Sequence, residues 1–370
     1  MKTVLSVFGT RPEAIKMIPV VKALRASSKL HSVVAVTGQH REMLSHVFSA
    51  FDESPDIDLG IMSAGQSLSD ITRLALTGVE KVIDDVCPDV VLVHGDTTTA
   101  LAAAIAAFYK KIPVGHVEAG LRSHNIKLPW PEEFNRITID SISSFLFAPT
   151  ETAASNLRRE TLLERNIYVT GNTGIDSLMQ TEESVKRSPV RHELRLEPDK
   201  KLVLVTGHRR ESFGIGFHDI CSGLLKLASR GDVQIVYPVH LNPQVRGPVI
   251  EALAATKSIH LIEPVGYHEM VDLMCRAHFI LTDSGGIQEE APALGKPVLV
   301  MRDVTERPEA IQTGVASLVG TNPDMIFAEG SRLIDDVAYY ASRARRVYPY
   351  GDGQASIRIV QALEQGLGLE

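Results

Sequence analysis

The segment VLSVFGTRPE occupies residues 4–13, and LVLVTGHRRE, at residues 202–211, repeats its pattern. Each segment begins with an apolar run, reaches a glycine (Gly9 or Gly207) and continues into arginine and glutamate. This is the pattern of a parallel strand that turns through glycine into a helix, the place where open α/β sheets bind ligands. Because the pattern occurs once in each half of the chain, it predicts two similar α/β domains.

Strand-like and helix-like segments alternate on both sides of these two turns. TVLSVFG, HSVVAVTG and VVLVHGD are strand-like in the first half, as are KLVLVTG, DVQIVYPVH and HFILTDSGG in the second. Strands that are apolar on both faces and alternate with helices are typical of parallel sheets covered by helices. We therefore predict two doubly wound, Rossmann-like domains, at residues 1–170 and 171–354, with a ligand cleft between the carboxyl ends of their strands. The polar stretch from about residue 179 to 201 is expected to be a linker.

The composition argues against several classes of protein. The chain has 370 residues and a formal net charge of -7 without a basic stripe, so no nucleic-acid partner is expected. Its longest apolar run, at residues 100–108, is far shorter than the ~20 residues that span a bilayer. The N-terminus has no secretory cleavage pattern, and the three separated cysteines are expected to be reduced thiols in the core. We therefore expect a soluble, cytoplasmic protein.

The segment LTDSGGIQEEAPALGKPVLV, at residues 281–300, predicts a strand, a small-residue turn and the start of a helix. Ser284, Gly285 and Gly286 have little bulk, so backbone N–H groups at the helix N-terminus can approach a phosphate closely. Glu290 lies about one helical turn later, where it can accept hydrogen bonds from sugar hydroxyls. A tight structural turn would give the same pattern. Neither GxGxxG nor GxxxxGK occurs in the chain, which argues against a nicotinamide dinucleotide or a P-loop nucleotide.

Basic residues follow the first strand of each half. Arg11 and Lys16 lie early in the first helix, where cations oppose the helix dipole, so an anionic ligand would explain their presence. His208 follows the matching strand of the second half and directly precedes two arginines. A histidine at this position is equally consistent with a structural role.

Acidic residues follow strands or open helices at three places in the first half. Asp96 ends VVLVHGD, Glu118 ends PVGHVE, and Glu132 stands in LPWPEEFNR. Each acid alone is consistent with an ordinary helix cap. Three acids at neighbouring strand or loop ends instead suggest acid–base chemistry, because crowded carboxylates can divide the roles of general acid and general base.

Taken together, FGTRPEAIKM, VHGDTTT, HVEAGLRS, PEEFNR, GHRRE, TDSGGIQEEAPALGKPV and TERPEA resemble, in this order and over almost the whole chain, the non-hydrolysing UDP-N-acetylglucosamine 2-epimerases. The resemblance implies a GT-B fold in which the last helix, at about residues 355–370, packs back on the first domain. It also implies a cytoplasmic homodimer that interconverts UDP-GlcNAc and UDP-ManNAc, a precursor of surface polysaccharide, without a metal or another cofactor. In this family UDP leaves C1 as a carboxylate removes the C2 proton, and UDP returns after C2 is reprotonated on its other face.

The resemblance also implies roles for individual residues. The catalytic positions of the family are matched by Asp96, Glu118, Glu132 and His208. Its substrate-binding positions are matched by Arg11, Lys16, Arg136, His240, Val265, Met270, Ser284, Gly285, Gly286, Glu290 and Arg307, with Val265 and Met270 near the uracil. Some members bind a second UDP-GlcNAc as an activator, and the candidates for that site in this chain are Gln39, His40 and Gln66. Gly65 stands where those members have an arginine, and Ser212 replaces the asparagine that usually ends HRREN.

Three other functions compete with this one. A hydrolysing epimerase would release ManNAc and UDP, so product analysis separates it from the first hypothesis. A GT-B glycosyltransferase would share the phosphate turn, and it would retain activity after D96N or E118Q. A regulator would bind the UDP-sugar without turning it over.

Overall fold

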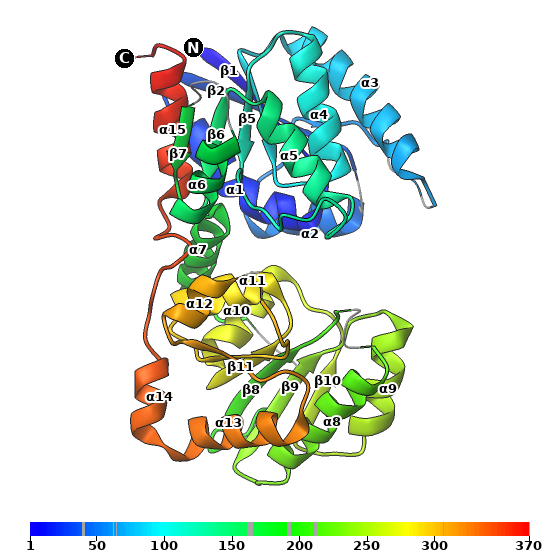
Figure 1. The fold of residues 1–370 in the computed structure, drawn as a ribbon, viewed down its shortest axis with the longest axis vertical. Coiled ribbons are helices and arrows are strands. Elements are labelled where there is room, and N and C mark those ends of the chain that lie inside the picture. The colour runs from blue at the N-terminus through cyan, green and yellow to red at the C-terminus, as the bar shows by residue number, and fades with distance from the viewer. Residues whose placement is uncertain are drawn as a thin grey trace. The chain divides into compact units, whose positions relative to one another are not determined.

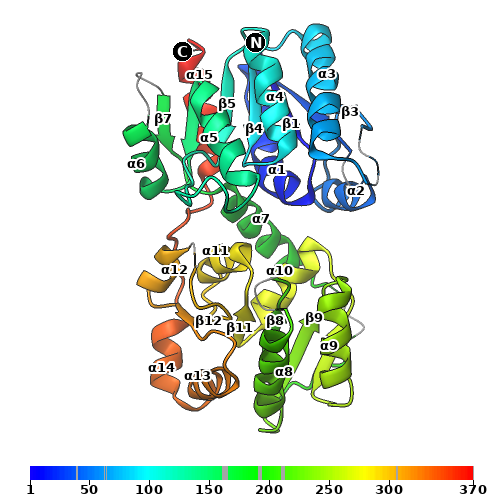
Figure 2. The same cartoon turned by 45° about the vertical axis from the view of Figure 1, so that its right-hand side comes forward.

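Two compact units make up the chain (Figures 1 and 2). The computed structural model describes residues 1–38, 41–61, 63, 65–160, 166–190, 194–209, 213–305 and 307–369. Unit 1 comprises Met1–Met179 and Tyr350–Glu370, and unit 2 comprises Gln180–Pro349. The boundary falls inside helix α7 (Thr173–Arg187), and the C-terminal segment belongs to unit 1.

Unit 1 is built around a seven-stranded parallel sheet with the strand order β3-β2-β1-β4-β5-β6-β7. Its strands are β1 (Lys2–Phe8), β2 (Leu30–Val36), β3 (Ile57–Asp58), β4 (Val90–His94), β5 (Val114–Val117), β6 (Phe145–Ala148) and β7 (Asn166–Val169). Strand β1 pairs with both β2 and β4, so the order in which strands are added reverses between β1 and β4. Ligands of open α/β sheets bind near this reversal, beyond the carboxyl ends of the strands.

Eight helices of unit 1 lie in the part of the chain that the structure describes. They are α1 (Arg11–Ala26), α2 (Arg41–Ala50), α3 (Leu68–Val86), α4 (Thr98–Tyr109), α5 (Glu132–Ile142), α6 (Glu151–Glu160), α7 and α15 (Ala355–Gly366). The alanine-rich face of α4 is buried against the sheet, because its small side chains allow close approach to β4 and β1. Helix α15 packs on α1 and β7, where Ser27 Oγ donates a hydrogen bond to Glu364 Oε1 at 2.6 Å.

Unit 2 contains a six-stranded parallel sheet with the strand order β10-β9-β8-β11-β12-β13. Its strands are β8 (Lys201–Thr206), β9 (Val233–Pro238), β10 (Ile259–Ile262), β11 (Phe279–Thr282), β12 (Val298–Val300) and β13 (Ala316–Leu318). The helices around it are α8 (Ile215–Ala228), α9 (Pro243–Leu253), α10 (Tyr267–Arg276), α11 (Gly285–Ala293), α12 (Pro308–Gln312), α13 (Pro323–Asp335) and α14 (Val337–Arg343). Buried side chains of β8, β9 and α8 form the centre of its core, with Phe217 and Tyr237 among the largest.

The two units repeat one topology. Strand β8 is flanked by β9 and β11 in unit 2, as β1 is flanked by β2 and β4 in unit 1. Gly9 follows β1 and Gly207 follows β8, so the two repeated sequence segments occupy equivalent places. The prediction of two doubly wound parallel α/β units is confirmed.

Two local expectations were wrong. The polar stretch that begins at residue 179, expected to be a linker, is helical as far as Arg187. Lys186 and Glu182, one helical turn apart, form an ion pair of 2.7 Å that stabilises this helix. Cys87 is exposed, because it ends α3 in the left-handed conformation (φ 50°) and does not lie on the buried face of that helix. Cys221 is buried as expected, and burial raises the pKa of its thiol to about 11. Of the helices described, none is both long and apolar enough to span a bilayer.

Candidate active site

Glu118 lies in a turn at the carboxyl end of β5, and no helix follows it directly. Its backbone is in the left-handed region (φ 71°), which is uncommon for residues other than glycine and concentrates at functional sites. The amide of Glu118 donates to Phe147 O at 3.1 Å, which holds the turn against β6. Gly120 completes the turn with φ 84°, and a Cβ at this position would lie 2.3 Å from Ala153 O. The helix-cap explanation of Glu118 is therefore wrong.

The carboxylate of Glu118 forms a hydrogen-bonded ion pair with Lys16 of α1, and only 14% of its side chain is exposed. His94, the last residue of β4, places Nε2 3.7 Å from the same carboxylate. Burial lowers the pKa of His94 to about 3, so its imidazole is neutral at physiological pH. Neither ring nitrogen of His94 has a hydrogen-bond partner among the described residues. Because buried polar atoms are normally satisfied, such atoms beside a carboxylate indicate a functional site.

Asp96 follows β4 in the turn that leads to α4. The cap of α4 is Thr97, whose side chain accepts from Ala100 N at 3.0 Å, so Asp96 is not needed as a cap. Its carboxylate instead forms an ion pair with Arg136 of α5. Its backbone carbonyl accepts from Asn135 Nδ2 at 2.8 Å. Helix α5 thus fixes both the backbone and the side chain of Asp96.

The two adjacent glutamates at the start of α5 have different surroundings. Glu133 is fully buried and accepts the backbone N–H groups of Ser123 and His124 at 2.9 and 3.0 Å, so it is a structural residue. Glu132 has a buried Oε2 without a hydrogen-bond partner among the described residues. An unsatisfied carboxylate oxygen is costly to bury unless a ligand or water completes it. Glu132 therefore remains a candidate for chemistry, and Glu133 does not.

Glu13 connects the turn after β1 with the turn after β4. Its carboxylate accepts from Gly9 N and Thr10 N at 3.0 and 2.7 Å and from Thr97 Oγ1 at 2.7 Å. Burial raises the pKa of Glu13 in spite of these bonds. Arg11, the first residue of α1, directly follows Thr10. The first turn of α1 is thereby held in register with the end of β4.

A buried charge network lies behind these turns. His116 of β5 places Nδ1 2.6 Å from Asp140 Oδ1 and Nε2 2.7 Å from Gly95 O. Both partners are acceptors, so both ring nitrogens donate and the imidazole carries a positive charge. Asp140 Oδ2 also accepts from Gly120 N at 3.2 Å and pairs with Arg122 Nη1 at 2.7 Å. Burial opposes the ionisation of Asp140, but the charges of His116 and Arg122 outweigh it and hold its pKa below the ordinary value.

This network joins the two turns that carry Asp96 and Glu118. Gly95, which precedes Asp96, accepts from His116 through its carbonyl. Gly120, two residues after Glu118, donates its amide to Asp140. Both carboxylates are therefore positioned by one rigid, charged element rather than by separate loops.

In unit 2, Asp283 organises the turn after β8. Asp283 is fully buried, and its Oδ2 accepts the backbone N–H groups of His208 and Arg209 at 2.7 and 2.8 Å. Its Oδ1 lies 3.4 Å from His208 Nδ1. Burial, together with the nearby charges of Arg209 and His240, lowers the pKa of His208, although Asp283 acts in the opposite direction. The rings of His208 and His240 stack with their centroids 5.5 Å apart.

The small-residue turn begins helix α11, as predicted. Ser284 is the N-cap residue and makes no capping hydrogen bond with its own side chain. Gly285 leaves room for the guanidinium of Arg307, since a Cβ there would lie 3.2 Å from Arg307 Cζ. Arg307 Nε donates to Glu289 Oε1 at 2.9 Å, which fixes the guanidinium beside the helix N-terminus. A helix N-terminus with an arginine beside it favours an anion.

The remaining unit 2 candidates lie at the same edge of the sheet. Glu290 accepts from Tyr267 Oη at 2.9 Å, and burial raises the pKa of this tyrosine well above its ordinary value. Val265 and Met270 are half-buried and follow the carboxyl end of β10. His240 follows β9 and accepts from Asn242 N through Nδ1 at 3.1 Å. Ligands of parallel α/β sheets bind at this edge.

Comparison with known proteins decides the family. A sequence profile described as UDP-N-acetylglucosamine 2-epimerase matches residues 22–364. The UDP-N-acetylglucosamine 2-epimerase of Escherichia coli strain K12 is 54% identical, over 98% of each chain. The chain belongs to the UDP-N-acetylglucosamine 2-epimerase family.

Solved structures of this family agree with the fold. The crystal structure of UDP-GlcNAc 2-epimerase from Neisseria meningitidis bound to UDP-GlcNAc is 47% identical and superposes with a TM-score of 0.91, covering 98% of this chain and 100% of that one. The enzyme of Methanocaldococcus jannaschii in complex with UDP-GlcNAc and UDP is 35% identical with a TM-score of 0.80, covering 99% and 100% of the two chains. The two Rossmann-like units therefore constitute the predicted GT-B fold.

Several polar residues of this epimerase-family site were missed by the sequence reasoning. They are Glu13, His94, His116, Asp140 and Asp283. Four of them lie inside or beside motifs that were selected for another residue. His94 and His116 are polar residues within otherwise apolar strands, and this pattern could have identified them. Among the described residues no three His, Cys, Asp or Glu side chains are arranged to hold a metal ion.

The candidates for a second, activating site are only partly placed. Gln39 and His40 lie outside the described residues, as does Ser212. Gln66 accepts from Ser63 N at 2.8 Å and donates to Ile61 O at 2.9 Å, so its carboxamide bonds to its own loop.

Proposed function

We propose that this chain interconverts UDP-GlcNAc and UDP-ManNAc by reversible epimerisation at C2, without releasing free sugar. The observation that carries the proposal is the geometry of Glu118. Its backbone is held in an uncommon conformation, and its carboxylate is partly buried between the Lys16 ammonium and a neutral His94. The relatives named as UDP-N-acetylglucosamine 2-epimerases, and the solved relative bound to UDP-GlcNAc, support the substrate.

We propose that unit 2 binds the UDP moiety. The turn of Ser284, Gly285 and Gly286 would hold the diphosphate through backbone N–H groups, with Arg307 supplying a positive charge. Glu290 would accept hydrogen bonds from the ribose hydroxyls. Uracil would pack near Val265 and Met270, whose polarizable thioether suits an aromatic ring.

The reaction we propose is an elimination followed by an addition. The C2 proton is lost to a carboxylate, the C2–H electron pair forms the C1=C2 double bond, and UDP leaves with the electrons of the C1–O bond. Positive charge develops at C1 as UDP departs, and nearby carboxylates stabilise it. Readdition of UDP to C1, with delivery of a proton to the opposite face of C2, gives UDP-ManNAc and restores every atom.

The carboxylates of unit 1 would divide these roles. Glu118 and Glu132 would exchange the C2 proton on opposite faces of the ring. Glu118 is held in a partly buried turn beside Lys16, and Glu132 has a buried Oε2 without a hydrogen-bond partner among the described residues. Asp96, fixed by Arg136, would stabilise the positive charge at C1. His208 and the arginine of α1, Arg11, would interact with the departing diphosphate.

A time course followed by proton and phosphorus NMR tests this proposal. UDP-GlcNAc incubated with the protein should approach an equilibrium with UDP-ManNAc, and free UDP should not accumulate. Accumulation of UDP with free ManNAc would instead identify a hydrolysing enzyme. E132Q should abolish turnover. The matched control is E133Q, because the carboxylate of Glu133 accepts backbone hydrogen bonds that stabilise the fold. Any loss of activity in E133Q should therefore parallel a loss of thermal stability.

We also propose that the protein is a cytoplasmic homodimer that supplies UDP-ManNAc for surface polysaccharide. Unit 1 exposes several large apolar side chains, including Tyr109 at 71% and Trp130 at 67%, which a partner subunit could cover. Light scattering should then give about twice the 40.4 kDa mass of one chain. A mass of one chain at micromolar concentration would contradict the dimer.

A further inference from the structure

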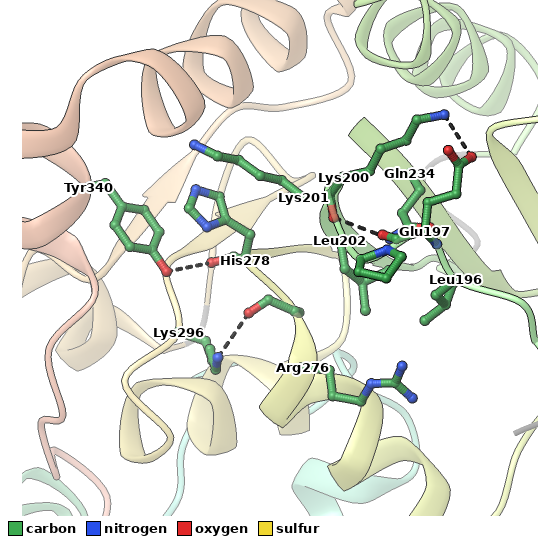
Figure 3. Close-up of a pocket in the computed structure, with 12 residues that line it drawn as sticks. Leu196, Glu197, Lys200, Lys201, Leu202, Gln234, Arg276, His278, Lys296 and Tyr340 are labelled. Atoms are coloured by element: carbon green, nitrogen blue, oxygen red, sulfur yellow. Dashed lines mark hydrogen bonds and ion pairs between the residues drawn. The ribbon is translucent and has the colours of Figure 1, made fainter. Parts of the chain in front are cut away.

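A cavity lies in unit 2, at the opposite edge of the sheet from the proposed UDP-binding turn (Figure 3). Its volume is about 500 Å³, within the range of small-molecule sites. It opens where β8 and β11 begin, at Lys201 and His278, whereas Ser284 follows the other end of β11. The cavity is therefore separate from the candidate active site.

Positive charge dominates the lining of this cavity. Its described residues include Lys200, Lys201, Arg276 and Lys296 and one acid, Glu197, although the whole chain has a net charge of -7. Glu197 pairs with Lys200 at 2.7 Å. An excess of cations around one cavity, in a chain that is acidic as a whole, favours an anionic ligand.

Two of the lysines keep donors for a ligand. Lys201 Nζ donates to Ile334 O at 2.7 Å, and Lys296 Nζ donates to Ala277 O at 2.9 Å. These carbonyls lie at the ends of α13 and α10, so each lysine also serves a helix C-terminus. An ammonium has three donors, and neither lysine forms an ion pair with an acid of the described ranges. The carbonyls therefore use only part of what each lysine offers.

The walls of the cavity are built before any ligand arrives. Gln234 is buried, accepts from Glu197 N at 2.8 Å and donates to Glu197 O at 2.8 Å, which fixes the loop before β8. On the other side, the rings of His278 and Tyr340 stack at 4.0 Å with an angle of 5°, and His278 Nε2 bonds to Leu333 O at 3.1 Å. Preformed walls reduce the entropy that a ligand loses on binding.

We propose that this cavity binds a small phosphorylated metabolite, of sugar-phosphate to mononucleotide size. A phosphate monoester carries between one and two negative charges at neutral pH, which matches a cavity with two lysines that lack acidic partners. Arg276, exposed at the rim, pairs with Asp272 at 3.5 Å through Nη1 and would offer its other N–H donors to the phosphate. The size of the cavity leaves room for a sugar or nucleoside beside the phosphate. This proposal does not depend on the function proposed for the active site.

Calorimetric titration of the full chain tests the proposal with four probes: adenosine 5′-monophosphate, ribose 5-phosphate, inorganic phosphate and uncharged adenosine. We expect at least one organic phosphate to bind at millimolar concentration or below, and adenosine to bind far more weakly. Binding of both organic phosphates would indicate that the phosphate and ribose suffice, and binding of the mononucleotide alone would indicate a base-binding wall. No binding by any phosphate, or equal binding of adenosine, would overturn the proposal.

Variants locate the binding. K201Q and R276Q should each weaken the phosphorylated probe roughly tenfold, because each removes a nearby positive charge. R276Q changes an exposed residue and so keeps the test valid if K201Q disturbs the end of α13. The matched control K226Q changes a lysine of α8 that pairs with Asp324, and it should bind like the wild type. Unchanged affinity in both K201Q and R276Q would place the ligand elsewhere, including in the active site, and would refute the proposal.

Discussion

Replacing Asp140 with asparagine should uncouple the two turns that carry Asp96 and Glu118. In the wild type the Asp140 carboxylate compensates the charges of His116 and Arg122, both within 2.7 Å, in a fully buried position. Breaking a buried ion pair costs about 3–5 kcal/mol. The side-chain oxygen of asparagine can still accept from His116, so we expect a loss near the lower end of this range, about 3 kcal/mol, in the free energy of unfolding.

The activity of D140N should fall further than its stability alone explains. Misplacing reactive groups by about 1 Å costs on the order of 100-fold in rate, so we expect kcat to fall roughly 10- to 100-fold at temperatures where the variant is folded. The affinity for UDP should remain near that of the wild type, because the turn proposed to hold the diphosphate and the residues proposed to hold the ribose and uracil are in unit 2. NMR turnover assays and calorimetric titration with UDP measure the two quantities on the same samples.

The pH dependence gives a second readout of the same variant. The folded-state pKa of Asp140 is lowered, so its ionisation stabilises the fold above the unfolded pKa of ~3.9, and this contribution disappears as the pH falls through the folded pKa. The stability difference between wild type and D140N should therefore be constant above about pH 5 and should shrink below about pH 4. The matched control D84N removes an exposed partner of Lys110 on α3 and should change stability by less than about 0.5 kcal/mol. Wild-type kcat together with wild-type stability in D140N would refute the positioning role.

Four further changes test other parts of the site. E118Q should lower kcat by about 10²- to 10⁴-fold, the usual contribution of a general base. Thermal unfolding and calorimetry should show that the variant is folded and still binds UDP. A decrease of kcat of tenfold or less would exclude Glu118 as the base. H94Q should remove an acid-sensitive component of stability, because the pKa of His94 is about 3 in the folded protein and about 6.5 in the unfolded chain. Between pH 7 and pH 4 the free energy of unfolding of the wild type should therefore fall by about 3 kcal/mol relative to that of H94Q. Parallel curves of stability against pH would contradict a buried neutral histidine. G120A should destabilise unit 1 by about 2–4 kcal/mol in denaturant titrations, because of the positive φ and the contact with Ala153 O, and an unchanged midpoint would mean that the turn adapts. R307A should weaken UDP binding roughly tenfold or more without affecting the unfolding of unit 1, whereas unchanged affinity would remove Arg307 from the diphosphate site.

The fold could be predicted because its determinants are local. A strand, a glycine turn and a helix occur together in ten residues, twice, and alternation of apolar strands with helices is sufficient to indicate parallel sheets. Where two residues of similar propensity are adjacent, the sequence could not decide between them. Asp96 and Thr97 are both good caps, and only the structure shows that Thr97 accepts from the helix.

The site depends on contacts that are distant in sequence. Lys16 and Glu118 are 102 positions apart, so their ion pair depends on where the fold places α1 and the end of β5, and not on any local pattern. The positive charge of His116 likewise follows from two acceptors, at Gly95 and Asp140, that the strand sequence does not reveal. The resemblance to a family located the carboxylates, and it said nothing of the network behind them.

In the proposed reaction, carboxylates around C2 exchange its proton, and the sugar is recovered only as UDP-sugar. The most direct measurement is a reaction of UDP-GlcNAc in deuterium oxide, followed by proton NMR and mass spectrometry. We expect UDP-ManNAc, and in time UDP-GlcNAc as well, each carrying one deuterium at C2. Formation of UDP-ManNAc that retains the original C2 proton, or no exchange by active, pure protein, would contradict it.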